Sequence, residues 1–260
     1  MVILCLNLFE YMLNTSIFSN IPPVVKNLII ICTGLFLVMW LIPAVGSSFE
    51  RLFALYYYTS PVAKPYQYFT YMFLHGGFGH LFFNMFALFM FGRTIEMVMG
   101  SQRFLFYYLT CGLCAALVQT AVFAWQIHGL ESMLPAEVVK TVTEQGYGLL
   151  RDGYNYSNPD MGALNAYINT PMVGASGAIY GVLLAFGFLF PNMPVYLFFV
   201  PVPIKSKWIV LGYFVLELLY GVTGSADGVA HFAHLGGMIF GFLLLLYWKR
   251  KGVFNNHWFF

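Results

Sequence analysis

Six long apolar segments run along the chain, separated by polar or aromatic stretches. Each segment is continuously hydrophobic, and a helix that spans a membrane needs about 20 mostly apolar residues. A transmembrane β-barrel would instead show strands of about ten residues with alternating polarity. The pattern predicts an all-α polytopic membrane protein whose six helices span about residues 27–45, 80–99, 104–127, 172–190, 207–222 and 229–248.

The composition of the 260 residues agrees with a membrane location. Only 8% of the residues are charged, whereas soluble domains usually carry about 25%. So few charges could not cover the surface of a soluble globule, and a 60% apolar content excludes a disordered chain. The net charge of +2 offers no basic surface for nucleic acid. The expected surroundings are therefore the lipid bilayer and other membrane proteins.

The basic residues predict an orientation. Eight Lys and Arg residues fall on the side that holds both termini, and four fall on the other side. Because cytoplasmic loops carry an excess of Lys and Arg, we expect both termini in the cytoplasm. The expected organisation is a cytoplasmic N-terminal segment (1–26), a membrane domain (27–250) and a cytoplasmic tail (251–260). So compact a form suggests a bacterial inner (plasma) membrane.

Two loops on the outer side are long. The first, about 46–79, is rich in tyrosine, which favours the membrane–water interface. The second is an insert at about 128–170, the most polar part of the chain, and its segment 135–151 could form a short surface helix. Cys111 and Cys114 form a C-x-x-C pattern inside an apolar run, where small-residue packing is favoured over redox or metal chemistry.

Polar residues inside predicted membrane helices are few, and each is a functional candidate because such residues are unfavourable in lipid. Pro171 after Thr170 predicts the start of one helix, which puts Ser176 roughly 8 Å deep. Asp227 is the expected N-cap of the last helix, which puts His234 roughly 10 Å deep. Three parallel helices thus bring polar groups to one depth, namely His80, Asn84, Ser176 and His234.

Glycine spacing predicts which helix faces meet. Gly177 and Gly181 form G-x-x-x-G beside Ser176, and Gly237 and Gly241 form another on the face of His234. Small residues at this spacing let helix backbones approach closely. If the two faces meet, the Ser176 hydroxyl and the His234 imidazole come within hydrogen-bond reach.

His80 and Asn84 lie four residues apart and point the same way. Their side chains offer hydrogen-bond donors to a developing oxyanion. The alternative is a buried hydrogen-bonded pair that braces the first loop.

These residues identify a resemblance to the rhomboid intramembrane serine proteases over about residues 60–250. It rests on H-x-x-x-N at His80–Asn84, on G-x-S-G at 174–177, and on H-x-x-G-x-x-x-G from His234 to Gly241. The resemblance implies a six-helix rhomboid-like bundle. It also implies an endopeptidase that cleaves transmembrane substrates at or near the outer membrane face through a Ser–His dyad, with no cofactor or metal.

The resemblance also implies a role for each matching residue. Ser176 is the expected nucleophile and His234 its general base. The expected oxyanion hole combines His80, Asn84 and the backbone N–H of Ser176. The supporting residues are Tyr180, which stacks on the catalytic histidine, Glu96, a structural acid, His75, which braces the first loop, and the glycines Gly174, Gly177, Gly237 and Gly241.

Two polar residues keep open interpretations. Glu217, a charge inside a predicted span, needs a partner or a wet cavity that the sequence does not name. His231 is interpreted as lining a water-filled mouth, with contact to substrate or oxyanion as the alternative. Asp227 is interpreted as a cap rather than as a third catalytic residue. No H-E-x-x-H pattern supports a zinc site.

The chain departs from the family pattern at two places. Tyr66-Gln67 stands where relatives often have Trp-Arg, and the 128–170 insert is longer than in compact relatives. The main alternative function is a catalytically inactive rhomboid-like factor that binds membrane proteins. A transporter is a weaker alternative, because no inverted repeat is evident. The substrate and the oligomeric state are not indicated by the sequence.

Overall fold

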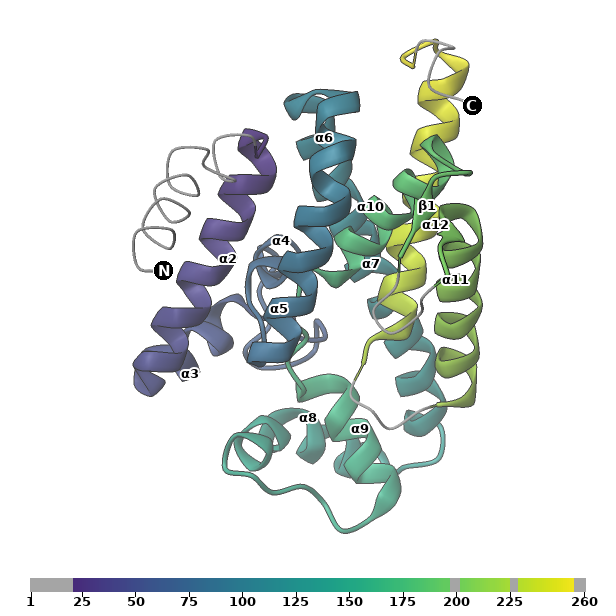
Figure 1. The fold of residues 1–260 in the computed structure, drawn as a ribbon. Helices are drawn as coiled ribbons and strands as arrows, with labels where there is room; N and C mark the ends of the chain where they lie inside the picture. Colours follow the sequence, from purple (N-terminus) through teal and green to yellow (C-terminus); the bar gives the residue numbers. More distant parts are fainter. Residues whose placement is uncertain (1–20, 197–201, 225–228, 255–260) are drawn as a thin grey trace.

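The computed structural model describes residues 21–196, 202–224 and 229–254. Helices dominate this part of the chain (Figure 1). Its only strands are β1 (Pro194–Val195) and β2 (Ile204–Lys205), a two-residue antiparallel pair. The predicted all-α class is therefore confirmed, and the fold is that of a polytopic membrane protein.

All six predicted apolar segments are helical. Five helical segments of the described chain are long and apolar enough to cross a membrane: α2 (Pro23–Leu41), the continuous run of α5 (Phe78–Ala87), the π-turn η2 (Leu88–Gly92) and α6 (Arg93–Met99), then α7 (Ser101–Glu131), α11 (Ser206–Thr223) and α12 (His231–Arg250). The sixth, α10 (Ser176–Leu189), is an apolar helix of only 14 residues. Trp40, Phe83 and Val222 are each more than 60% exposed, as lipid-facing side chains would be.

The start of α10 differs from the prediction. Pro171 does not begin the helix, because Leu55 and Met172 pair as an antiparallel bridge with N–O distances of 2.9 and 2.8 Å. Gly174 follows with a φ of +127°, which is not helical. The helix therefore begins at Ser176, and Thr170 is instead the C-cap of α9 (Pro159–Asn169).

The last helix also begins later than predicted. Ala230 is the N-cap of α12, so His231 is its first residue and His234 lies in its first turn. Asp227, the expected cap, lies outside the described residues. Ser176 and His234 therefore lie nearer the starts of their helices than the sequence predicted.

The close contact of α10 with α12 agrees with the glycine spacing. A Cβ atom on Gly237 would overlap the carbonyl oxygen of Gly177, and one on Gly181 would lie 2.5 Å from Cys111 Sγ. Only glycine leaves room for backbones this close. On α12, a Cβ atom on Gly241 would lie 2.5 Å from the Tyr107 hydroxyl of α7. The two G-x-x-x-G faces therefore bring α7, α10 and α12 together.

The 128–170 insert forms a helical lobe. It holds α8 (Ala136–Arg151), which confirms the predicted surface helix, and α9. The lobe lies at the end of the bundle opposite the last turns of α6 and α12 (Figure 1). Its own small core joins Val142 of α8 and Leu164 and Ile168 of α9 to Ile127, near the end of α7.

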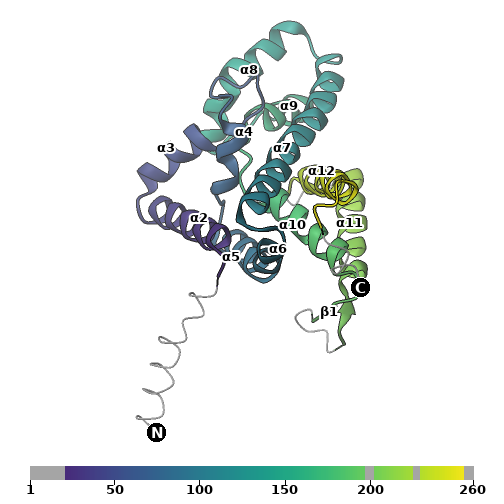
Figure 2. The same ribbon diagram turned by 90° about the horizontal axis from the view of Figure 1, so that it is seen from above.

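The first loop folds into α3 (Pro43–Phe53), α4 (Gln67–Thr70) and the short 3-10 helix η1 (Tyr71–Phe73). Gln67 is fully buried, and its Nε2 donates to the carbonyl oxygens of Leu52 and Val62 at 3.2 and 3.1 Å. Figure 2 shows α3 and α4 between α2 and the lobe. A neutral amide thus anchors this loop from within.

The contact between α10 and α12 predicts an effect of Gly237→Ala. The added methyl group would overlap the Gly177 carbonyl, so we expect the protein to lose about 1–3 kcal/mol of stability. Gly212→Ala in α11 is the matched control, because its Cβ atom would meet no atom within 4 Å. Thermal unfolding in detergent measures both; equal melting temperatures for the two variants would contradict the prediction.

Candidate active site

Ser176 and His234 meet at the starts of α10 and α12. The Ser176 Oγ lies 2.7 Å from the His234 Nε2, which is hydrogen-bond distance. Tyr180, one turn after Ser176, stacks on the His234 ring with centroids 4.2 Å apart and planes 8° from parallel. The side chain of His234 is 8% exposed. Its orientation toward Ser176 is therefore set by packing on one face and by a hydrogen bond at its edge.

His80 lies beside Ser176 because Gly174 has no side chain. A Cβ atom on Gly174 would lie 2.7 Å from both Cε1 and Nε2 of His80 and 3.7 Å from Ser176 Oγ. The positive φ of Gly174 also favours glycine. The His80 ring thus packs over the backbone that leads into α10.

Asn84 is buried one turn further along α5. Its Nδ2 donates to the carbonyl oxygen of His80 at 2.9 Å, a bond within its own helix. The amide carries two N–H groups, so this bond uses one donor. The His80 ring lies against the backbone two residues before Ser176, whereas Asn84 is hydrogen-bonded to the His80 backbone.

Two of the residues predicted to support the site, His75 and Glu96, lie in different parts of the bundle. His75 is buried beside His80, with ring centroids 5.1 Å apart. Glu96 lies in α6, at the other end of the helical run that begins with α5. There its carboxylate accepts the backbone N–H groups of Val24 and Val25 at 2.9 and 2.8 Å. The Ser101 hydroxyl donates to it at 2.7 Å. Glu96 therefore holds the first turn of α2.

Glu217 of α11 also reaches this site. Its Oε2 lies 2.7 Å from His231 Nδ1 and 3.0 Å from His234 Nδ1, and its Oε1 accepts the Tyr180 hydroxyl. The side chain is 9% exposed. Sequence reasoning noticed the charge without naming its partners. Spacing along the chain would not have supplied them, because a symmetric hairpin of α11 and α12 places position 217 opposite about position 237, beyond both histidines.

The expectation for His231 was wrong. We expected it to line a water-filled mouth, but the residue is only 7% exposed and bonds to Glu217. Together Glu217, His231 and His234 hold potential metal-ligand atoms within 4.8 Å of one another. In this structure those atoms pair with each other, and His234 also pairs with Ser176. A metal-free site remains a prediction.

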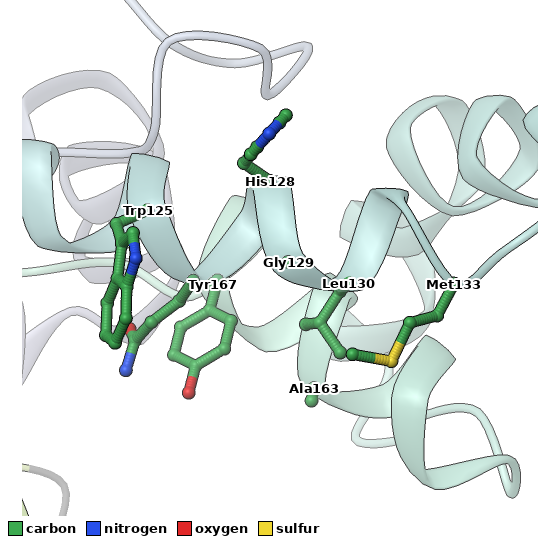
Figure 3. Close-up of a pocket in the computed structure, with 8 residues that line it drawn as sticks. Trp125, His128, Gly129, Leu130, Met133, Ala163 and Tyr167 are labelled. Carbon is green, nitrogen blue, oxygen red and sulfur yellow. The ribbon is translucent and has the colours of Figure 1, made fainter.

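A surface pocket of about 390 Å³ lies elsewhere, between the end of α7 and α9 (Figure 3). None of the predicted site residues lines it. The lining residues are Trp125, Gln126, His128, Gly129, Leu130, Met133, Ala163 and Tyr167.

Comparison with known proteins identifies the family. The profile described as the Rhomboid domain matches residues 62–251. The chain belongs to the rhomboid family. The resemblance found from the three sequence motifs is therefore confirmed. The helical bundle that brings Ser176 to His234 is a rhomboid domain.

Three curated relatives match the chain. Rhomboid protein 1, mitochondrial, of Saccharomyces cerevisiae is 26% identical over 94% of this chain and 62% of its own length. The RHOMBOID-like protein 12, mitochondrial, of Arabidopsis thaliana is 31% identical over 65% and 42%. The rhomboid protease AarA of Providencia stuartii is 29% identical over 66% and 52%. This rhomboid therefore spans less than two thirds of each relative.

The names of the relatives are relevant to the membrane in which this protein resides. Two of the three carry mitochondrial names, which weighs against the bacterial inner membrane that we expected from the compact form. The multi-pass membrane location itself is supported by the family and by the five membrane-length helical segments of the described residues.

The burial of His75 predicts how this rhomboid responds to acid. Burial, and next the nearby charge of His80, lower the His75 pKa to about 4 from an ordinary value near 6.5. Between these pH values His75 therefore binds a proton in the unfolded chain but not in the folded chain. The contribution of His75 to the free energy of unfolding is thus highest above pH 6.5 and falls as the pH drops toward 4. Melting temperatures of His75→Gln should fall less steeply than those of the wild type across this window. Parallel curves would contradict this prediction.

Proposed function

We propose that this rhomboid is an intramembrane serine endopeptidase that cleaves transmembrane substrates at or near the outer membrane face. The observation that supports it most is the 2.7 Å contact of Ser176 Oγ with His234 Nε2. A hydroxyl in this contact can pass its proton to the imidazole as it attacks a carbonyl carbon. The match to a relative named as a rhomboid protease supports the same reaction.

The proposed reaction runs in two halves. Ser176 Oγ bonds to the scissile carbonyl carbon while its proton passes to His234 Nε2. The resulting tetrahedral intermediate breaks its C–N bond, and the leaving amine takes that proton. Water then gives a proton to the same nitrogen and attacks the acyl ester, which restores the Ser176 hydroxyl and releases the new carboxyl end.

The oxyanion of that intermediate needs hydrogen-bond donors. Ser176 is the first residue of α10, and the first N–H groups of a helix have no partner within the helix. The positive end of the helix dipole adds to their attraction for an anion. The His80 ring beside Gly174 supplies a second candidate donor, and Asn84 a third through its remaining N–H.

Proteolysis in a membrane also needs water and an unwound substrate. A transmembrane helix satisfies its own peptide groups and excludes water, so we propose that cleavage occurs near the outer end of the bundle and after local unwinding. We place the lobe of α8 and α9 on that side, with both termini on the opposite, basic side. The substrate class is then a single-pass protein whose N-terminus lies on the outer side, with a small residue before the scissile bond.

The first test compares the wild type with Ser176→Ala and His234→Ala in detergent. Cleavage of a rhomboid-sensitive transmembrane substrate should be lost in both variants, because each lacks one partner of the proton transfer. A fluorophosphonate probe should label the wild type and not Ser176→Ala. Melting temperatures control for folding. A folded wild type that neither labels nor cleaves would contradict the proposal and favour the inactive binding factor.

The second test addresses the oxyanion. We expect His80→Ala and Asn84→Ala each to lower kcat by about 10²–10³-fold with little change in KM, because the charge they stabilise exists only in the transition state. Steady-state cleavage of the same substrate measures both constants. Unchanged kcat in both variants would leave the α10 backbone as the only donor.

A further inference from the structure

Glu217 is a buried carboxylate with three potential hydrogen-bond donors around it. These are the Tyr180 hydroxyl on Oε1 and the Nδ1 atoms of His231 and His234 near Oε2, at 2.7 and 3.0 Å. An ionised carboxylate in an apolar bundle is very unfavourable unless such donors surround it. The environment of Glu217 is therefore built to hold a negative charge beside His234.

The contacts also favour one arrangement of the ring protons. An ionised carboxylate only accepts hydrogen bonds, so it attracts a proton on the His234 Nδ1 atom 3.0 Å away and repels a lone pair there. In His234 this leaves Nε2 unprotonated, and Nε2 is the atom that lies 2.7 Å from Ser176 Oγ. The tautomer that Glu217 favours is thus the one that can accept the Ser176 proton.

We propose that Glu217 is a positioning residue for His234, so that the site works as a Ser176–His234–Glu217 arrangement rather than as a dyad. This inference rests on the proposed function. The carboxylate holds the productive tautomer of His234 and offsets the positive charge that the ring gains when it takes the Ser176 proton.

Tyr180 strengthens this arrangement because it touches both partners. Its ring stacks on His234 with centroids 4.2 Å apart, and its hydroxyl donates to Glu217. The carboxylate and the imidazole are therefore held by one side chain of α10, the helix that begins with Ser176.

His231 shares the same carboxylate oxygen. Its Nδ1 makes a hydrogen bond to Oε2, whereas the 3.0 Å contact of His234 does not align its N–H well enough for one. In the resting site the effect of Glu217 on His234 is thus mainly electrostatic. A positive charge on His234 strengthens the attraction, which is when catalysis needs it.

The test measures kcat and KM of Glu217→Gln in the whole 260-residue chain in detergent. A glutamine amide can donate to His234 Nδ1 and so favours the wrong tautomer. We expect kcat to fall about 100-fold or more with KM within about threefold of the wild type. Glu217→Asp keeps the charge and should retain more activity than Glu217→Gln.

Glu96→Gln is the matched control. Glu96 is also buried and also accepts three donors, but it lies at the first turn of α2, away from Ser176. We expect this variant to lower the melting temperature while the folded protein keeps a kcat within about twofold of the wild type. The control separates the general effect of losing a buried carboxylate from the specific effect of losing the Glu217 carboxylate beside His234.

Two results would overturn the inference. One is a wild-type kcat in Glu217→Gln; the other is an equal loss of kcat in Glu96→Gln. In either case cleavage by the wild type and its absence in Ser176→Ala would leave the proposed function standing. A wild type that does not cleave would instead remove the proposed function itself.

A second measurement needs no Glu217 variant and so holds even if Glu217→Gln does not fold. Nitrogen-15 NMR of histidine-labelled wild type reports the tautomer of each ring, and His234→Asn assigns the His234 signal. We expect neutral His234 with its proton on Nδ1. A proton on Nε2 would overturn the inference.

Discussion

The backbone contact between α10 and α12 is the constraint on which the rest of the site depends. Gly237 has no room for a Cβ atom against the Gly177 carbonyl, so the two helices approach as closely as their main chains allow. Ser176 and His234 lie in the first turns of these helices. Their 2.7 Å contact follows from that approach, because any larger side chain in the interface would separate the two groups.

Two buried carboxylates show how the bundle accommodates charge in an apolar setting. Glu96 accepts two backbone N–H groups of α2 and a hydroxyl, while Glu217 faces a hydroxyl and two imidazoles. Both solutions surround the anion with donors. They differ in what the donors are: Glu96 accepts from groups that stay neutral, whereas Glu217 faces two imidazole rings, a type of group that can gain a positive charge near neutral pH.

The first loop is tied through the main chain to the segment that leads into Ser176. Leu55 pairs with Met172, and the Gly174 N–H donates to the Tyr71 carbonyl at 3.0 Å. The buried Gln67 holds the loop from inside. These contacts hold the segment before α10 in a non-helical form, so that the helix starts at Ser176 and the first N–H groups of α10 have no partner within the helix. A loop far away in the sequence thus shapes the end of the helix where chemistry is proposed.

The apolar runs by themselves determined the fold class and the six helical segments, because lipid leaves the backbone no partner other than its own helix. Local spacing likewise determined that the glycine faces of α10 and α12 meet and which residues could react. Only the tertiary structure decided that α10 starts at Ser176, since the bridge from Leu55 to Met172 overrides the helix-start signal at Pro171. It also decided the partners of Glu217, because they come from two other helices and no local pattern specifies which faces of separate helices meet.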